Sequence, residues 1–252
     1  MSTLPLHGRV ALVTGGARRT GRSIALALAG AGADLVIHYN TSAAEAEAVV
    51  AEVEAIGRRA LAVAADLADA EATATAFRAA GERLGRLDIL VNNACGIIWK
   101  RLEDTSAAEW HTAVEQTLHI TYHACQAVLP AMRAAGGGAI VNMSSGVWLG
   151  GGADMEAYSS AKAAIVGLTN SLARDYGRHR IRVNAVAPGM ITTERQRRLW
   201  YQDESLIQAG LQRQCTPDPV TEADVAEVVL FLASDAARGI TKQLVPVNGG
   251  LR

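Results

Sequence analysis

The chain has 252 residues, of which 50% are hydrophobic and 19% are charged, and its formal net charge is −1. This length is enough to bury the core of one α/β domain, and the near-neutral charge excludes an electrostatic field that would attract nucleic acid or a membrane surface. The three cysteines are widely spaced, which argues against a disulfide framework and fits a reducing compartment. With no signal-peptide pattern at residues 1–8 and no apolar run of about 18 residues, we expect a cytoplasmic protein.

Short β-branched runs alternate with long alanine-rich segments along the chain. The predicted strands are residues 10–14, 35–39, 60–64, 89–91, 139–143, 182–186 and 244–247. The predicted helices are residues 21–31, 43–56, 70–84, 107–135, 157–176 and 222–232. Because the strands are continuous apolar runs, they belong in a parallel sheet that is buried on both faces. We therefore predict a single-domain α/β fold, a Rossmann-like doubly wound sheet in three layers.

One segment interrupts this alternation. Residues 192–219 are polar and rich in arginine and glutamine, with Trp200 and Tyr201 among them. Long insertions after the carboxyl end of a strand often form lids or specificity loops. Ligands of open α/β sheets bind at those carboxyl ends. We therefore predict a substrate lid at about residues 192–219.

A glycine-containing turn follows the first predicted strand and opens the first helix. Residues 14–21 read TGGARRTG, and glycines here let the backbone approach a pyrophosphate whose charge lies at the helix N-terminus. The signal is weak by itself, because many glycines in such turns only shape the turn, and Arg19 stands where the second glycine of the dinucleotide fingerprint is expected. We interpret the turn as a cofactor-binding loop whose contacts include Gly15, Arg18, Arg19, Thr20 and Gly21.

The end of the second predicted strand selects between the two nicotinamide dinucleotides. A carboxylate there accepts hydrogen bonds from the ribose of NAD and repels the extra phosphate of NADP. This strand runs on without an acidic residue before Glu45, and an arginine fork from the neighbouring turn suits a phosphate. NADP(H) is therefore the preferred cofactor and NAD(H) the alternative, while a competing interpretation makes both arginines solvated surface charges. The expected contacts at this end are Asn40, Thr41 and Ser42.

Three side chains suggest proton transfer. Tyr158 and Lys162 are four residues apart in a predicted helix, so both project from one face. A free tyrosine with a pKa near ~10 is a poor base at neutral pH, but a neighbouring ammonium and an oxidised nicotinamide favour the phenolate. Ser145 follows the preceding strand, where its hydroxyl can hold a substrate oxygen. An isolated Tyr-x-x-x-Lys is usually an ordinary helix pair, but the combination with Ser145 and the glycine turn indicates catalysis.

In the order and spacing of its motifs, the chain resembles a short-chain dehydrogenase/reductase over essentially its whole length. Besides the glycine turn, Ser145, Tyr158 and Lys162, the matching residues are Asp66, Asn92, Asn93, Ala94, Asn184, Pro188, Gly189 and the ending at 247–250. The resemblance implies hydride transfer between NAD(P)(H) and the carbon of an alcohol or carbonyl group. It also implies a homotetramer built partly on the helix that carries Tyr158.

The resemblance implies roles for individual residues. Tyr158 is the general acid/base, Ser145 orients the carbonyl or hydroxyl, and Lys162 binds the nicotinamide ribose and lowers the pKa of Tyr158. Asp66 is expected at the adenine, Asn92 near the adenosine ribose and the central sheet, and Ile191 and Thr193 at the carboxamide. The other implied cofactor contacts are Leu67, Asn93, Ala94, Pro188 and Gly189.

Three positions depart from the family pattern. Arg19 replaces a glycine, which we expect to reshape the pyrophosphate contact. Cys95 replaces the glycine of an Asn-Asn-Ala-Gly motif, and we expect a small buried residue rather than a reactive thiol. Thr117 stands where the family usually has an asparagine that completes a proton relay through bound water, largely by its main-chain carbonyl. A threonine also offers that carbonyl, so we expect catalysis to survive at a lower rate.

The histidines do not predict a metal site. They share no ligand spacing with acids or cysteines. His119 and His123 are four residues apart but lack the glutamate of a zinc-protease motif, so helix packing explains them better.

The substrate is the least determined part of the prediction. Trp148 and the lid residues Arg195 and Trp200 resemble the sugar (aldose) 1-dehydrogenase branch of the family, and polar donors beside flat aromatics suit a polyhydroxylated small molecule. The lid arginines can equally face solvent. They can also receive an acidic carrier protein, as in a 3-oxoacyl-[acyl-carrier-protein] reductase. A third reading, from a different functional class, is a catalytically impaired nucleotide-binding regulator, suggested by Arg19 and Thr117.

Overall fold

Seven parallel strands form one sheet in the computed structural model, which describes residues 4–191 and 203–251. The strand order is β3-β2-β1-β4-β5-β6-β7, and every neighbouring pair is parallel. The bounds are β1 (Val10–Val13), β2 (Asp34–Tyr39), β3 (Ala60–Ala64), β4 (Ile89–Asn92), β5 (Gly138–Met143), β6 (Ile181–Pro188) and β7 (Leu244–Val247). The order reverses between β1 and β4, which is where open α/β sheets bind their ligands. The predicted doubly wound sheet is confirmed.

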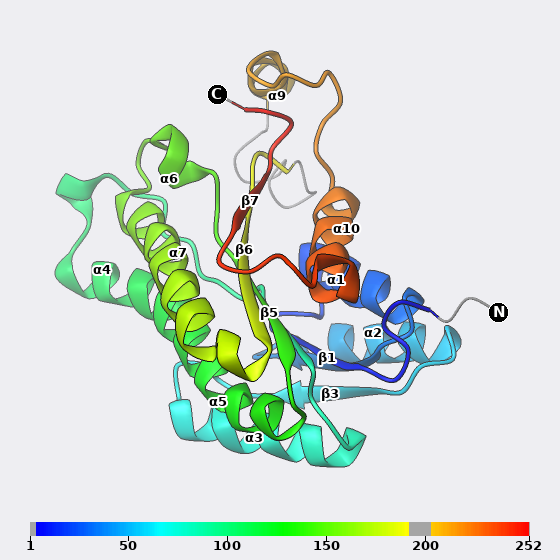
Figure 1. Ribbon diagram of the computed structural model, residues 1–252. Helices are drawn as coiled ribbons and strands as arrows, with labels where there is room; N and C mark the ends of the chain where they lie inside the picture. The colour runs from blue at the N-terminus through cyan, green and yellow to red at the C-terminus, as the bar shows by residue number, and fades with distance from the viewer. Residues whose placement is uncertain (1–3, 192–202, 252) are drawn as a thin grey trace.

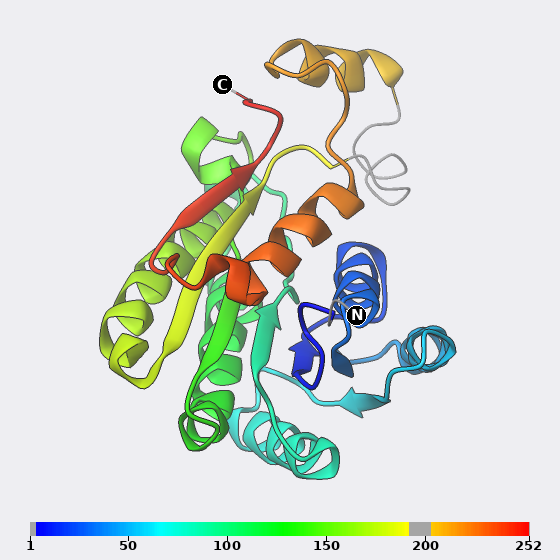
Figure 2. The same ribbon diagram turned by 45° about the vertical axis from the view of Figure 1, so that its right-hand side comes forward.

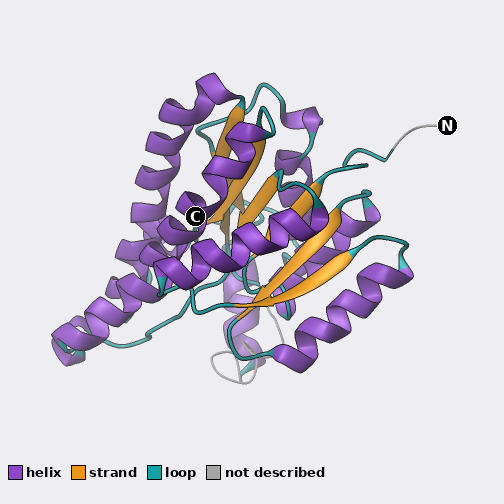
Figure 3. Ribbon diagram, turned by 90° about the horizontal axis from the view of Figure 1, so that it is seen from below, coloured by secondary structure: helices purple, strands orange, loops and turns teal. Residues whose placement is uncertain are grey.

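Helices cover both faces of the sheet (Figures 1 and 3). One face carries α1 (Arg19–Gly30), α2 (Ala43–Ala55) and α10 (Glu222–Ala233). The other face carries α3 (Ala70–Leu84), α5 (Ile120–Ala134) and α7 (Glu156–Tyr176). The shorter elements of the described residues are η1 (Leu102–Asp104), α4 (Ala107–Val114), η2 (Glu115–His119), α6 (Val147–Gly150), η3 (Gly177–His179), α9 (Glu204–Gln212) and η4 (Asp235–Ala237).

The sheet is buried between two apolar layers, as the continuous hydrophobic strands predict. All four residues of β1 are buried. Leu28 of α1 and Val229 of α10 pack in the layer on one face, and Phe77 of α3 and Met132 of α5 pack in the layer on the other. Burial of each such side chain contributes roughly 1.5–3 kcal/mol. These layers hold the strand ends in fixed positions, and the candidate site lies at those ends.

The helix predicted at residues 107–135 differs from the structure. It is two helices, α4 and α5, joined by the π-helical turn Glu115–His119. A π-turn inserts one extra residue into the helix, and such turns are frequent at functional sites. The sequence did not reveal the turn because the segments on both sides keep helical periodicity. Residue Thr117 lies inside the turn and is fully buried.

Among the elements that were not predicted are two short α-helices, α6 and α9. Helix α6 begins at Val147, shortly after Ser145, and α9 lies within the predicted lid segment. Asp203 caps α9 by accepting a hydrogen bond from the Ser205 N–H at 2.8 Å. Figure 2 shows α9 and the C-terminus beyond the end of the sheet where β6 and β7 finish. Both short helices therefore lie at the carboxyl edge of the sheet.

Candidate active site

Tyr158 and Lys162 occupy successive turns at the start of α7. Both are buried, with relative exposures of 8% and 2%. The Lys162 Nζ lies 5.7 Å from the centre of the Tyr158 ring and donates a hydrogen bond of 2.6 Å to the main-chain carbonyl of Met143, the last residue of β5. The ammonium is thereby fixed at the carboxyl end of a central strand, directly beside the phenol.

Ser145 follows β5 and completes the group of three. Its hydroxyl is hydrogen-bonded to Tyr158 and accepts a bond of 3.3 Å from the Val147 N–H. The structure thus brings together the three residues that the sequence selected. A carbonyl oxygen placed between the two hydroxyls could receive a hydrogen bond from each.

Burial dominates the electrostatics of this group. It raises the pKa of Tyr158 above its ordinary range, and a smaller electrostatic effect of Cys95 acts in the same direction, while the hydrogen bond to Ser145 lowers it. Burial also lowers the pKa of Lys162, and Cys95 opposes that shift. The phenol is therefore held in its protonated form, which is the proton-donating form.

Cys95 is exposed, so the expectation that it is a buried residue is wrong. Cys95 lies in the loop after β4, which ends at Asn92. Cys95 lies close enough to raise the pKa of both Tyr158 and Lys162. The thiol therefore stands at the rim of the candidate active site.

The indole N–H of Trp148 makes a hydrogen bond inside the protein and is not free for a ligand. The indole Nε1 donates to the Ser144 hydroxyl at 3.1 Å, and that hydroxyl donates to the Lys162 carbonyl at 2.8 Å. The predicted substrate residue Trp148 is thus linked to the helix that carries Tyr158. Sequence reasoning missed Ser144, because a second serine beside Ser145 carries no motif signal.

Thr117 fastens the loop after β4. Its hydroxyl donates to the Gly96 carbonyl at 3.2 Å, and its own carbonyl accepts a bond of 2.8 Å from the Thr121 hydroxyl. The Gly96 N–H in turn donates to the Gln116 carbonyl at 2.8 Å. The side chain at this position therefore has a structural task that is separate from the predicted relay through its carbonyl.

The glycine-rich turn is tightly packed between strand ends. Gly15 has a φ of +61°, and a Cβ on Gly21 would lie 2.6 Å from Asn93 Nδ2, so a side chain is excluded there. Asn93 clamps the turn by donating to the carbonyls of Thr14 and Gly15 at 3.0 and 3.2 Å. Ala94 contributes a main-chain N–H to the Thr14 hydroxyl at 3.0 Å. Asn93 and Ala94 therefore lie at the predicted cofactor loop.

Arg19 has a left-handed backbone conformation, which glycine adopts most readily. This explains why the dinucleotide fingerprint has a glycine at this position. The φ of Arg19 is +50°, in the left-handed region that is unfavourable for residues with a Cβ. Strained residues of this kind cluster at ligand-binding sites. The departure from the family pattern is therefore a strained arginine at the N-terminus of α1, next to Thr20.

The adenosine end of the predicted cofactor site lies after β2 and β3. Asp66 and Leu67 follow β3, and the Asp66 carboxylate accepts a bond of 3.0 Å from the Ala68 N–H. Asn40, Thr41 and Ser42 connect β2 to α2, and Ser42 caps α2 without a side-chain hydrogen bond. Arg18 is paired with Glu45 at 3.4 Å, with both side chains about half exposed. The Glu45 carboxylate would therefore compete with a cofactor phosphate for Arg18.

Asn92 lies inside the central sheet. It is buried, and its Nδ2 donates to Asn142 Oδ1 at 2.8 Å. Asn142 in turn donates to the Thr169 hydroxyl at 2.9 Å. The side chain of Asn92 thus links β4 to β5 within the sheet, which matches its expected place in the central sheet.

The other end of the site is built around β6. Pro188 ends β6, its carbonyl accepts the Gly146 N–H at 2.9 Å, and the Gly189 N–H donates to Val247 at 2.9 Å. Ile191 is buried. Three predicted site residues, Thr193, Arg195 and Trp200, lie outside the described residues.

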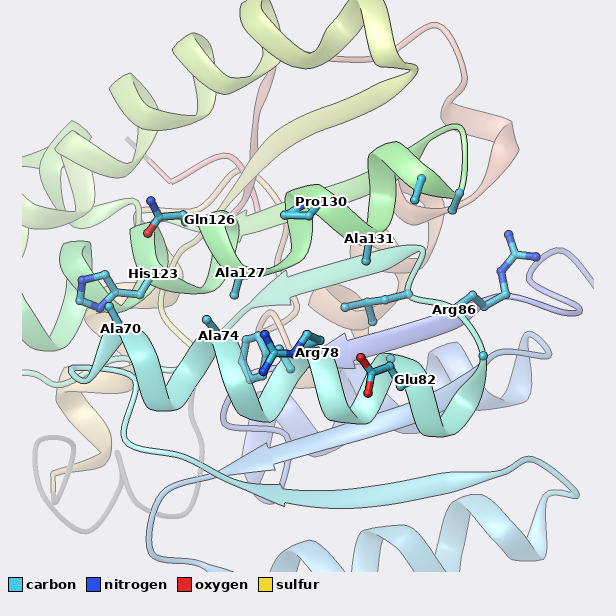
Figure 4. Close-up of a pocket in the computed structure, with 16 residues that line it drawn as sticks. Ala70, Ala74, Arg78, Glu82, Arg86, His123, Gln126, Ala127, Pro130 and Ala131 are labelled. Carbon is cyan, nitrogen blue, oxygen red and sulfur yellow. The ribbon is translucent and has the colours of Figure 1, made fainter.

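Residues 4–191 and 203–251 contain neither a metal-binding cluster nor a membrane-spanning helix. No group of three or more His, Cys, Asp or Glu side chains in these ranges could hold a metal ion. No helix there is long and apolar enough to cross a membrane. A groove of about 800 Å³ between α3 and α5, lined by alanines together with charged and polar side chains, lies away from Tyr158 (Figure 4).

Comparisons with known proteins identify the family. A family model described as enoyl-(acyl carrier protein) reductase matches residues 15–252. A protein of Rhizobium meliloti (strain 1021), described as a probable galactose dehydrogenase, is 40% identical over 249 residues, which cover 98% of this chain and 96% of that protein. The chain belongs to the short-chain dehydrogenase/reductase family.

Two further relatives mark the breadth of this family. The 3-oxoacyl-acyl-carrier-protein reductase of Staphylococcus aureus (strain Mu50) is 38% identical, with 96% of this chain and 97% of that protein covered. A 7α-hydroxysteroid dehydrogenase, solved with NADH and a 7-oxo bile acid, superposes with a TM-score of 0.93 at 33% identity, over 99% of this chain and 96% of that chain. As a short-chain dehydrogenase/reductase, the protein is an NAD(P)(H)-dependent oxidoreductase acting on CH–OH groups.

Proposed function

We propose that this short-chain dehydrogenase/reductase interconverts an alcohol or sugar hemiacetal and its carbonyl product with NADP(H), using Tyr158 as the general acid/base. The observation that carries the proposal is the buried Tyr158 phenol, hydrogen-bonded to Ser145 with Lys162 Nζ 5.7 Å from its ring. A bound nicotinamide supplies or accepts the hydride. The protein's own task is then to move one proton to or from the substrate oxygen.

Each of the three residues has a separate part in that step. In reduction, Ser145 donates a hydrogen bond to the carbonyl oxygen, and Tyr158 gives its phenolic proton to the same oxygen. In oxidation, the phenolate takes the proton back from the alcohol. Lys162, held by the Met143 carbonyl, stabilises the phenolate through its positive charge. The main-chain carbonyl of Thr117, in the buried π-turn, is proposed to hold a water molecule that carries the proton onward.

We propose that a dinucleotide binds along the carboxyl ends of the strands, with its pyrophosphate at the glycine-rich turn. Gly21 packs against Gly15 and Asn93, where a Cβ has no room, and the turn leads into the N-terminus of α1, where a pyrophosphate is favoured. We propose that Gly15, Arg18, Arg19 and Thr20 hold the phosphates. The remaining proposed contacts are Asn40, Thr41, Ser42, Asp66, Leu67, Asn93, Ala94, Pro188, Gly189, Ile191 and Thr193.

The preference for NADP(H) rests on charge at the end of β2. No acidic residue lies between Tyr39 and Glu45, and Arg18 and Arg19 are exposed in the adjacent turn. The dissociation constants of NADPH and NADH, measured by the fluorescence of the reduced nicotinamide, test this preference. Tighter binding of NADPH supports it, and equal binding of both cofactors overturns it.

Two substrate classes remain as candidates. The similarity to the probable galactose dehydrogenase, at 40% identity, supports a sugar, for which Trp148, Arg195 and Trp200 are the proposed contacts. The similarity to the 3-oxoacyl-acyl-carrier-protein reductase, at 38% identity, supports a β-keto thioester. Family membership favours both over a regulator without catalysis. The homotetramer and the cytoplasmic location stay predictions from the sequence.

One absorbance assay separates the substrate classes. Aldoses, polyols and secondary alcohols are offered with NADP⁺ and NAD⁺, and β-keto thioesters and small ketones with NADPH and NADH. Turnover of aldoses alone supports the sugar reading, and turnover of β-keto thioesters alone replaces it with the reductase reading. Tight NADPH binding without turnover of any substrate would contradict the proposed activity on these classes.

A further inference from the structure

His38 joins three strand ends of the predicted adenosine site. It is the penultimate residue of β2 and is 2% exposed. The Gly15 N–H, in the glycine-rich turn after β1, donates to His38 Nδ1 at 3.2 Å. On the other side of the ring, Nε2 lies 3.0 Å from the carbonyl of Ala65, just after β3. One imidazole therefore spans the turn expected at the pyrophosphate and the segment expected at the adenine.

The two partners determine where the proton of His38 resides. A main-chain N–H can only donate and a carbonyl can only accept. Nδ1 must therefore be the unprotonated nitrogen, and Nε2 must carry the proton that is donated to Ala65. A second proton, on Nδ1, would place two N–H donors opposite each other and break the hydrogen bond from the Gly15 N–H. The arrangement works only while the imidazole is neutral.

The surroundings of His38 favour that neutral form. Burial lowers the pKa of His38 to about 4, although the Ala65 carbonyl and the charge of Asp66 act in the opposite direction. From α3, the Phe77 ring meets the imidazole edge-on at 5.8 Å, and the glycine-rich turn presents the main-chain N–H of Gly15. Among the described residues, Asp66 is the charged group that acts on this imidazole.

A second histidine holds the same segment from α5. His123 Nδ1 lies 2.8 Å from the carbonyl of Leu67. Figure 4 shows His123 at one end of the groove between α3 and α5, beside Ala70. Asp66, the residue expected at the adenine, is thus flanked by two main-chain carbonyls that imidazoles hold in place. The segment is fixed from β2 on one side and from α5 on the other.

We propose that His38 is a positioning residue for the cofactor: it locks the glycine-rich turn to the segment 65–67 so that the pyrophosphate and adenine sites keep a fixed separation. The proposal rests on the dinucleotide site of the proposed function. It assigns His38 no contact with substrate and no part in proton transfer. Loss of the lock therefore weakens cofactor binding and leaves the chemistry of Tyr158 unchanged.

Two variants of His38 and one control test the proposal. His38→Leu removes both hydrogen bonds and leaves two buried main-chain groups unpaired. His38→Asn keeps a short acceptor opposite the Gly15 N–H and loses the reach to Ala65. Phe77→Leu alters the packing against the same imidazole while both hydrogen bonds remain, so it measures the effect of a loosened core alone.

The dissociation constants of NADPH and NADH are measured for each folded variant, with kcat at saturating cofactor as a second readout. We expect His38→Leu to raise both constants about tenfold, equivalent to about 1.4 kcal/mol, His38→Asn to raise them by a smaller factor, and Phe77→Leu to leave them unchanged. We expect kcat to stay within about twofold of the original in all three. Unchanged binding in both His38 variants, or an equal rise in Phe77→Leu, would overturn the proposal.

This test is separate from the test of the proposed function. Both cofactors carry the same adenosine diphosphate half, so the expected rise does not depend on a preference for NADPH. Binding is read without turnover, so a wrong substrate assignment does not alter it. Should His38→Leu fail to fold, His38→Asn against Phe77→Leu still decides the outcome.

Discussion

The Lys162 ammonium lies 5.7 Å from the centre of the Tyr158 ring while the Met143 carbonyl holds it at 2.6 Å. The positive charge is therefore fixed by main chain rather than by the phenol itself. It remains in place when Tyr158 gains or loses its proton. This relationship leads to a prediction for the pH dependence of the two reaction directions.

Oxidation and reduction respond differently to pH because burial raises the pKa of Tyr158. Oxidation needs the phenolate, so its kcat/KM rises with pH, by about tenfold per unit while the pH is below the pKa in the complex. Reduction needs the neutral phenol, so its kcat/KM stays level through neutral pH and falls only on the alkaline side. Lys162→Met removes the fixed charge and shifts both limbs to higher pH. Steady-state pH profiles check this, and an oxidation rate that is flat with pH in the original protein contradicts it.

Glu45 is predicted to reduce the preference for NADP(H). It pairs with Arg18 at 3.4 Å and competes with any phosphate at the end of β2. Glu45→Gln frees the guanidinium, so the NADPH dissociation constant should fall a few fold, about the effect of one exposed ion pair, while that of NADH stays constant. Glu47→Gln, on the exposed face of the same helix, is the matched control. A parallel change for both cofactors would show that Arg18 does not meet the extra phosphate.

Arg19 is predicted to lower the free energy of unfolding and to strengthen the binding of NADPH. Its φ of +50° is unfavourable for a residue with a Cβ, so Arg19→Gly should raise the free energy of unfolding by about 1 kcal/mol. The same change removes a guanidinium from the turn and should weaken NADPH binding. Arg18→Gly, at a residue with an extended backbone, should not stabilise the protein. Urea unfolding and NADPH titration check the pair of effects, and a loss of stability in Arg19→Gly argues against strain at this residue.

His38 is predicted to limit stability in acid. Burial lowers the pKa of His38 from 6.5 to about 4, so the unfolded chain takes up this proton first as the pH falls. The stability that depends on neutral His38 is fully present above pH 6.5 and is lost as the pH falls toward 4, by roughly 3 kcal/mol in total. Urea unfolding at about pH 7 and about pH 4.5 should show a smaller decrease for His38→Asn than for the original protein. Equal decreases would mean that His38 is not held neutral.

Much of the fold was predictable because it depends on local patterns. The strands 60–64 and 244–247 and the helix 70–84 have the predicted bounds, since apolar runs and an alanine-rich segment mark them directly. The meeting of Ser145, Tyr158 and Lys162 was also predictable, because their spacing carries the resemblance to the family. The cofactor and substrate roles of these and the other site residues stay predictions.

The remaining features depend on contacts that no local pattern records. The partners of His38, Gly15 and Ala65, come from two other segments and are joined only by the sheet order. The exposure of Cys95 follows from the way the chain leaves β4. The bond from Trp148 to Ser144 requires helix α6, which is too short for periodicity to predict.

The most direct test of the proposed mechanism is the turnover of Tyr158→Phe with the best substrate found in the absorbance assay. This change removes the transferable proton and leaves the ring in its buried place in α7. The mechanism predicts a loss of kcat of at least about 10²-fold, with cofactor affinity and the free energy of unfolding near those of the original protein. Full turnover by Tyr158→Phe would contradict the assignment of Tyr158 as the general acid/base.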